Sequence, residues 1–304
     1  MPFGGEKILP MAVSLFGRGM YPAFMSVSDL KKLLTQPNIL VAPGAADALT
    51  ARLVEDAGFA AVYVSGAGIA NTQFAIPDIG LLTMTEMIDA IRRIVAAVGI
   101  PLIADADTGY GTARNVVRTV QAYETAGVAA LQVEDQVTPK VSGHFNGKEV
   151  VTAEEMSRKI EAAANARNEM LIIARTDSLA THGFEEAVRR AKLFANAGAD
   201  LILIEAPTAK DQIAALPKEI CTPLVFNMTE GSKTPMMSHD ELEGMGYKMV
   251  IHPSLMTRIA ARAVQSALAV LQKTRSSELL LSAMLDWDER QRLTRFDEWE
   301  ALGS

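Results

Sequence analysis

Residues Ile103–Gly111 read Ile-Ala-Asp-Ala-Asp-Thr-Gly-Tyr-Gly, an apolar run that stops at two aspartates before a glycine-rich turn. The pattern indicates a buried strand that leaves the core where Asp105 and Asp107 appear. Residues two apart on an extended chain point the same way, so both carboxylates can face one spot. That arrangement suits Mg2+, a hard cation that takes oxygen ligands and keeps several waters. An ordinary Asp-rich turn explains the same stretch, because Asp and Gly also end strands.

Short apolar runs of this kind recur along the chain, each continuous, as expected for strands buried on both faces. The candidate strands are Ile39–Ala42, Ala61–Val64, Leu102–Ala104, Ala130–Val133, Leu171–Ala174, Leu201–Ile204, Leu224–Phe226 and Met249–Ile251. Helical stretches alternate with them, among them Ser26–Leu34, Thr83–Val98, Ala113–Ala126, Ala153–Arg167, Phe184–Ala197 and Ser238–Met245. A helix-ending glycine, such as Gly127 or Gly198, precedes several strands and strengthens the repeat.

This alternation predicts a parallel sheet closed into a (β/α)8 TIM-type barrel. An open doubly wound sheet is the alternative, but no Gly-x-Gly-x-x-Gly follows the first strand. No linker divides the chain, so we expect a single domain over residues 1–304 with an N-terminal arm at 1–25. Residues 276–304 form an additional helical segment rich in Leu and Trp. Its apolar surface lies beyond a complete barrel and is expected to pack on a neighbouring subunit.

The composition excludes several classes of protein. With 49% hydrophobic and 21% charged residues, the chain is typical of globular proteins. A formal net charge of -7 lacks the basic footprint of nucleic-acid binding, so no nucleic-acid partner is expected. No apolar run has the length of a membrane span, so no membrane partner is expected either. One cysteine, Cys221, fits a reducing compartment, and we expect a cytoplasmic protein.

The active site of such a barrel lies at the carboxyl ends of its strands. Polar residues stand at these ends one strand after another: Ser65 and Gly66, Asp105 and Asp107, Glu134 and Asp135, Arg175, Glu205, Asn227 and Glu230, and His252–Ser254. One strand-end carboxylate is ordinary, but a ring of such groups predicts a metal-dependent site for an acid. Asp177, by contrast, is interpreted as a cap or turn residue.

The long loop of residues 136–151 exceeds a normal connection between a strand and a helix. Long loops in compact domains are usually lids or binding loops. Gly143 and Gly147 would let this one hinge. The side chains that it would carry over a substrate are Lys140, Ser142 and His144. A solvated surface loop is the alternative interpretation.

Five motifs occur in order along the predicted strands: Asp105-Ala-Asp107-x-Gly-Tyr-Gly, Glu134-Asp-Gln136, Pro139-Lys140-x-x-Gly143-His144, Ala174-Arg175-Thr-Asp177 and Asn227-Met-Thr-Glu230. Together they resemble the isocitrate lyase/phosphoenolpyruvate mutase superfamily, and within it the short methylisocitrate lyase and dimethylmalate lyase group. The likeness runs from about Leu33 to Leu271. It implies a (β/α)8 barrel in a homotetramer, a dimer of dimers that swap a helix near the C-terminus.

The resemblance also implies roles for individual residues. Asp105 would bind Mg2+, with Mn2+ as an alternative ion, and Asp78, Asp107 and Glu134 would reach the ion directly or through water. Catalytic roles would fall to Tyr63, Lys140, Ser142, His144, Arg175 and Glu205. Contacts to a small anionic carboxylic-acid substrate would fall to Ser65, Gly66, Ala67, Asp105, Arg175, Asn227, Glu230 and Pro253.

The implied activity is Mg2+-dependent cleavage of a carbon–carbon bond in a small 2-hydroxy or 2-oxo di- or tricarboxylate, through an enolate-type intermediate. Arg175 would hold a carboxylate in a fork geometry that lysine cannot supply. Tyr63 and Glu205 are both candidates for the group that removes the hydroxyl proton.

The long loop departs from the family. Its lyases have Lys-(Arg/Lys)-Cys-Gly-His there, and the cysteine protonates the carbanion left after cleavage; this chain has Lys140-Val141-Ser142-Gly143-His144. A serine hydroxyl is a far weaker acid than a thiol, whose pKa is about 8.5. Three explanations stay open: a natural enzyme with other proton delivery or another reaction, a natural lyase with weak activity, or an engineered, inactivated Cys-to-Ser variant.

The rival functions on this scaffold are also open. One is an oxaloacetate decarboxylase or hydrolase, which needs no cysteine acid. A phosphonate-type mutase ranks lower, because the loop keeps the lyase-like Gly143-His144 pair. The last is a barrel that binds acids without turnover.

Overall fold

Eight parallel strands form the centre of the computed structural model, which describes residues 27–143 and 147–302. Their order is β1-β8-β7-β6-β5-β4-β3-β2, and a bridge between Gly44 and Tyr63 joins β1 to β2. The strands are β1 Leu40–Pro43, β2 Val62–Val64, β3 Leu102–Asp105, β4 Ala130–Glu134, β5 Leu171–Thr176, β6 Leu201–Ile204, β7 Leu224–Asn227 and β8 Met249–His252. The predicted (β/α)8 barrel is confirmed, and the open sheet is wrong because β1 pairs with β8 and the Gly44–Tyr63 bridge joins β1 to β2.

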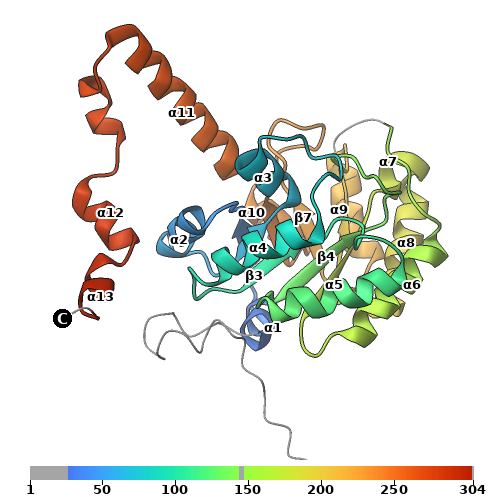
Figure 1. Cartoon of the computed structure of the whole chain (residues 1–304). Helices are drawn as coiled ribbons and strands as arrows, with labels where there is room; N and C mark the ends of the chain where they lie inside the picture. The colour runs from blue at the N-terminus through green and yellow to red at the C-terminus, as the bar shows by residue number, and fades with distance from the viewer. Residues whose placement is uncertain (1–26, 144–146, 303–304) are drawn as a thin grey trace, which may run out of the picture.

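Helices surround this barrel and follow its strands (Figure 1). They are α1 Val27–Thr35, α2 Ala48–Asp56, α3 Gly66–Ile69, η2 Ala70–Phe74, α4 Met84–Val95, α5 Ala113–Thr125, α6 Ala153–Ala166, α7 Ser178–His182, α8 Phe184–Asn196, α9 Lys210–Glu219, α10 His239–Met245, α11 Leu255–Thr274, η3 Glu278–Ala283, α12 Trp287–Leu293 and α13 Phe296–Glu300. Across residues 27–143 and 147–302, no helix has the length and apolar character needed to cross a membrane. The predicted N-terminal arm, 1–25, lies outside the described residues.

Most of the strands extend beyond their apolar run; β2 and β6 are the exceptions and end where the run ends. Asp105 still pairs with Gln132 of β4, and Arg175 still pairs with Leu203 of β6. The apolar runs alone placed these strand ends one or two residues too early, because backbone pairing continues beyond the apolar side chains. Several of the predicted site residues therefore stand on the last positions of strands, where the backbone is fixed.

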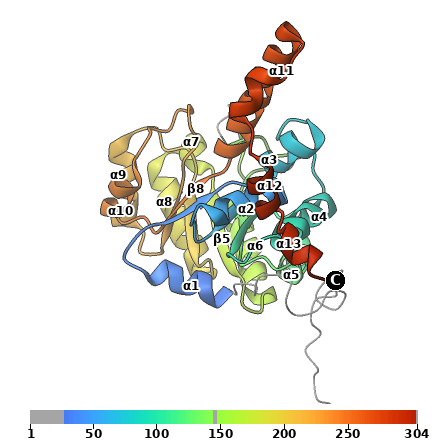
Figure 2. The same cartoon turned by 90° about the vertical axis from the view of Figure 1, so that its left-hand side faces the viewer.

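Side chains of the strands alternate between two cores. One core lies inside the barrel and includes Ile103, Ile173 and Leu203; the other lies between the strands and the surrounding helices. Leu30 of α1 is 0% exposed and packs in the inner core with Leu40, at the amino end of β1. Helix α1 therefore closes this end, at the bottom of Figures 1 and 2. The opposite end is left to the polar side chains.

The C-terminal arm, residues 255–302, leaves the barrel through α11 (Figures 1 and 2). All of α11 is described and none of its residues is buried. Its apolar side chains Ile259, Val264 and Leu268 are 56%, 58% and 59% exposed. Such uncovered apolar side chains are typical of an interaction surface.

The end of the arm returns to its own barrel. Leu293 of α12 is 3% exposed, and Arg52 of α2 donates to its carbonyl oxygen at 2.8 Å. Arg292 forms a two-pronged ion pair with Asp56, with N–O distances of 2.6 and 2.7 Å. The expectation that the segment from Ser276 packs on another subunit is therefore incomplete, because this part contacts α2 and the uncovered surface begins upstream, on α11.

We expect removal of all residues after Lys273 to yield either smaller oligomers than the full-length protein forms or aggregates. The truncation deletes the apolar residues beyond α11 and the contacts of α12 with α2, so less surface remains for association. Light scattering coupled to size exclusion measures the change. Arg292→Met, which removes only the ion pair with Asp56, should keep the full-length mass. If the truncated chain keeps both that mass and its melting temperature, the arm has another role.

Candidate active site

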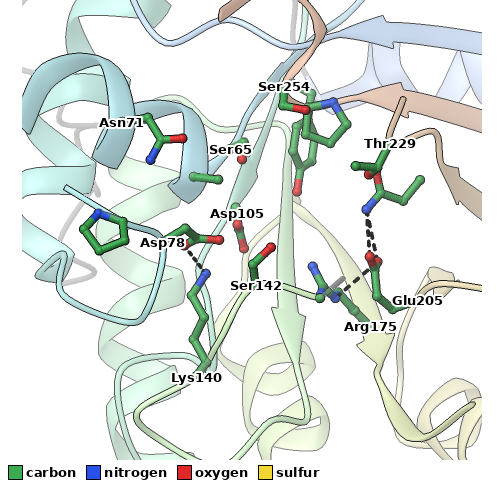
Figure 3. A pocket seen from close by; sticks show the side chains of 16 residues that line it. Ser65, Asn71, Asp78, Asp105, Lys140, Ser142, Arg175, Glu205, Thr229 and Ser254 are labelled. Carbon is green, nitrogen blue, oxygen red and sulfur yellow. Dashed lines mark hydrogen bonds and ion pairs between the residues drawn. The ribbon is translucent and has the colours of Figure 1, made fainter. Parts of the chain in front are cut away.

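A cavity of about 340 Å3 opens at the carboxyl ends of the strands (Figure 3). Predicted site residues that line it are Tyr63, Ser65, Ala67, Asp78, Asp105, Lys140, Ser142, Arg175, Glu205, Asn227 and Pro253. Asn71, Pro77 and Thr229 also line it, and the sequence analysis missed them. Predicted His144 lies outside the described residues. The structure thus brings residues from six of the eight strand ends, and from the long loop, to one cavity.

Asp105 and Asp107 converge on Gly66. The Gly66 amide donates to Asp105 Oδ2 at 3.2 Å, and a Cβ atom at Gly66 would lie 3.2 Å from Asp107 Oδ1. The convergence does not come from the extended alternation that the sequence suggested, because β3 ends at Asp105 and Asp107 has φ 47°. Instead the Asp107 amide donates to Asp105 Oδ1 at 3.0 Å, and this turn brings the carboxylates together.

Lys140 brings a positive charge to these carboxylates. Its Nζ pairs with Asp78 and lies 3.0 Å from Asp107 Oδ1, as Figure 3 shows for Asp78. Burial alone would lower the pKa of Lys140, but the charges of Asp107, Glu134, Asp105 and Asp78 raise it, so the ammonium stays protonated. Burial, followed by the charge of Asp105, raises the pKa of Asp107 to about 6. Because Lys140 carries only one positive charge, the carboxylates around it keep an excess of negative charge.

Arg175 stands at the centre of a second group of carboxylates. Its Nε and Nη2 donate to Asp177 at 2.9 and 3.2 Å, its Nη1 lies 3.2 Å from Glu134 Oε2, and its Nε lies 3.5 Å from Glu205 Oε2. Asp177 stands at the N-cap position of α7, as predicted, but its buried side chain makes no cap hydrogen bond and holds Arg175 instead. The two-residue spacing that drew attention to Asp105 and Asp107 also relates Arg175 to Asp177.

A buried carboxylate behind Asp177 fixes this turn. Asp135 is 0% exposed and accepts hydrogen bonds from the Asp177 amide at 2.9 Å and from Thr176 Oγ1 at 2.6 Å. Arg190 of α8 donates to the same carboxylate at 2.9 Å. Burial raises the pKa of Asp135 even with these partners. The sequence indicated Asp135 only as a strand-end residue, because its partner Arg190 is distant along the chain.

Glu205, Asn227 and Tyr63 also line the cavity. Asn227 Nδ2 donates to both oxygens of the fully buried Glu205, at 3.0 and 3.1 Å. Burial, with a smaller effect of the Asp105 charge, raises the pKa of Tyr63 well above its usual value. The phenol therefore stays protonated, so Tyr63 can donate a hydrogen bond to a substrate but is not a tyrosinate base.

Glu230 is a predicted substrate-binding residue that does not line the cavity. Its Oε1 lies 2.7 Å from His252 Nδ1, and His252 Nε2 lies 3.0 Å from His239 Nε2. This contact joins the loop that follows β7 to the end of β8. Glu230 thus contacts the neighbouring strand end rather than the space where a substrate would bind.

The carboxylates suit a divalent cation. In the described part of the chain, Glu134 Oε1 is buried without a hydrogen-bond partner, whereas Asp107 Oδ1 forms the ion pair with Lys140. Burial raises the pKa of Glu134, so a nearby cation would stabilise its charged form. Among the described residues, no three carboxylate, histidine or cysteine side chains form a ready-made ligand set. Mg2+ is commonly held by one or two carboxylates together with waters and substrate oxygens, so a complete protein cage is not required.

Sequence comparison finds one matching family and close relatives. The phosphoenolpyruvate phosphomutase family matches residues 30–272. The chain is 41% identical over 266 residues to 2,3-dimethylmalate lyase of Eubacterium barkeri, covering 87% of this chain and 92% of the relative. It is 41% identical over 271 residues to 2-methylisocitrate lyase of Aeropyrum pernix, covering 89% and 88%.

Solved structures resemble the barrel closely. Oxaloacetate acetylhydrolase in complex with the inhibitor 3,3-difluorooxalacetate superposes with a TM-score of 0.86 at 31% identity, covering 90% of this chain and 95% of that one. Phosphonopyruvate hydrolase in complex with oxalate and Mg2+ superposes with a TM-score of 0.82 at 32% identity, covering 91% and 98%.

We expect Asp105→Ala to weaken Mg2+ binding at least about 100-fold, since loss of even an outer-shell partner of a metal commonly costs about 10–100-fold. Isothermal titration calorimetry measures the affinity, and circular dichroism should show an unchanged fold. Asp211→Ala removes an exposed carboxylate on α9 and should leave the affinity as it is. Unchanged Mg2+ affinity in Asp105→Ala would remove Asp105 from the metal site.

Proposed function

Because the chain belongs to the phosphoenolpyruvate mutase/isocitrate lyase superfamily, we propose that it is a Mg2+-dependent carbon–carbon lyase acting on a small 2-hydroxy or 2-oxo di- or tricarboxylate. One observation carries the proposal: Asp105 and Arg175 line one cavity, and Glu134, 3.2 Å from Arg175, keeps a buried oxygen without a hydrogen-bond partner among the described residues. A cation and an anionic substrate together would balance these charges. The names of the two lyases that resemble the chain agree with this chemistry.

The metal would be held by Asp105, with Asp78, Asp107 and Glu134 contributing directly or through water. Mg2+, or Mn2+ in its place, supplies positive charge that polarises a substrate oxygen and stabilises enolate charge. Arg175 would bind a substrate carboxylate in its fork, since Asp177 holds the guanidinium in a fixed orientation.

Two proton transfers complete the proposed cleavage. Glu205 would accept the proton of the 2-hydroxyl group as that carbon becomes a carbonyl, and Asn227 orients its carboxylate for this role. Tyr63, which stays protonated, would donate a hydrogen bond to the substrate. The electrons of the broken carbon–carbon bond go to the carbon beside the second carboxylate, and that carbon takes up a proton. Ser142 lines the cavity and is the proposed donor, with Lys140 and the predicted His144 nearby in sequence.

Hydrolysis of oxaloacetate is the second candidate. Ser142 in place of a thiol favours it, because hydrolytic cleavage requires no cysteine acid. The similarity to oxaloacetate acetylhydrolase agrees with it. Product analysis with oxaloacetate, methylisocitrate and dimethylmalate in the presence of Mg2+ separates the two candidates. Release of no product from any of these acids would contradict both and favour a barrel that binds acids without turnover.

We infer a homotetramer, a dimer of dimers in which α11 of each chain packs on a partner. The uncovered apolar side chains of this helix support the inference. We also propose that residues 1–304 form one domain and that the protein is cytoplasmic. The single cysteine, Cys221, supports this location because reducing compartments do not favour disulfide frameworks.

We predict that Ser142→Cys raises lyase turnover on at least one 2-hydroxy acid by roughly 100-fold, because a thiol supplies an acid with a pKa nearer the operating pH. The Michaelis constant should change little, since hydroxyl and thiol make similar weak contacts with a bound substrate. Steady-state kinetics of both proteins on the same acids with Mg2+ provides the measurement.

The matched control is Ser254→Cys, which introduces a thiol elsewhere in the same cavity and should give no gain. If the unaltered protein is already as fast as Ser142→Cys, another group delivers the proton. The role given to Ser142 would then be wrong.

A further inference from the structure

Lys148 is a buried lysine in the long loop that the proposed mechanism does not use. Its side chain is 3% exposed, and its Nζ donates to the Gly143 carbonyl oxygen at 2.6 Å and to Asp177 Oδ1 at 2.8 Å. A buried ammonium is costly unless it is paired and hydrogen-bonded, so these two acceptors explain its position. Lys148 thus connects the loop directly to the carboxylate that orients Arg175.

The backbone around Lys148 is held on both sides. Gln136 and Val150 form an antiparallel bridge, and the Val137 amide donates to the Glu149 carbonyl at 2.9 Å. These contacts fix the second end of the loop to its first end. The Lys148 side chain therefore extends inward from an anchored backbone, rather than following a free loop.

The first end of the loop is held at Val141. Gln136 Nε2 donates to the Val141 carbonyl at 2.9 Å, and Gln136 Oε1 accepts from the Val141 amide at 3.1 Å. Ser142 and Gly143 follow immediately. Their backbone is therefore fastened by Gln136 on one side and by Lys148 on the other.

Gly143 lies against the groups that would bind the substrate. A Cβ atom at this position would collide with Arg175 Nη2 and come within 2.7 Å of Glu205 Oε1. So close an approach leaves no tolerance for a shift of the backbone. The hydrogen bond from Lys148 holds the Gly143 carbonyl in this arrangement and thereby sets the position of Ser142 in the cavity.

We propose that Lys148 is a positioning residue that fixes Ser142 and Gly143 against Arg175 through its shared bonds to Gly143 and Asp177. The expected effect of Lys148 on turnover rests on the proposed function, whereas its expected effect on the position of the loop does not. Arg175 has two hydrogen bonds of its own to Asp177, so we expect substrate binding to survive the loss of the Lys148 ammonium. The loss should fall on the step that needs Ser142 in place.

The test compares Lys148→Met with Arg167→Met. Arg167 is a matched control because it also bonds one carbonyl, that of Met170, and one aspartate, Asp200, at the amino end of β5. Lys148→Met should lower turnover by about tenfold or more, because misplacement of a reacting group by about 1 Å can cost about 100-fold. The Michaelis constant and the affinity for oxalate with Mg2+ should stay within about threefold of the original. Arg167→Met should reduce thermal stability without changing turnover, the Michaelis constant or the affinity for oxalate.

A second measurement does not depend on turnover. Tryptic cleavage after Lys140 requires local opening of the loop, and its rate reports how often the segment opens. Lys148→Met should accelerate this cleavage at least about tenfold. Mass spectrometry of the fragment that ends at Lys140 measures the rate. Arg167→Met should cleave at the original rate.

The outcomes are distinguishable. A rise in the Michaelis constant with unchanged turnover would mean that Lys148 acts on substrate binding, which overturns the proposal. Unchanged cleavage after Lys140 would overturn it as well. If the original protein turns over no acid, the proposed function fails, whereas faster cleavage in Lys148→Met still supports the structural role of Lys148.

Discussion

Burial of several carboxylates at one end of the barrel is the constraint on which the rest of the structure depends. An unpaired buried charge is very costly, so each carboxylate needs a cation or hydrogen-bond donors. Lys140, Lys148, Arg175 and Arg190 provide these partners, and they come from the long loop, from β5 and from α8. Because the cations arise from separate elements, the charges also hold the loop and the helix to the barrel.

The same charges separate the two ends of the molecule by function. Apolar residues of α1 and the strand beginnings close one end, and this packing contributes stability. The strand ends carry ionisable groups whose burial is unfavourable. Ion pairs and hydrogen bonds with neighbouring groups offset this cost. Glu134 Oε1 has no hydrogen-bond partner among the described residues, which is consistent with a site that keeps residual charge for a ligand.

The sequence predicted the barrel well because continuous apolar runs and helix-ending glycines are local signals. It also indicated many cavity residues, since strand ends meet at one face of any such barrel. It failed where partners are distant along the chain. Asp177 and Asp135 gain their roles from Lys148 and Arg190, and α12 contacts α2 through Leu293, which no local pattern reveals. The convergence of Asp105 and Asp107 was predicted for the wrong reason, because the turn that follows β3 depends on a side-chain hydrogen bond.

The close packing at Gly143 has an evolutionary consequence. No side chain fits at this position, so its neighbours cannot drift far without losing the arrangement of the cavity. Ser142, one residue earlier, points into open space within the cavity and differs from cysteine by a single atom. For most serine codons, a single base change gives a cysteine codon. Proteins with this backbone can therefore change the acidity of the side chain at position 142 while the rest of the cavity stays the same. Such a change could convert one reaction of the scaffold into a related one.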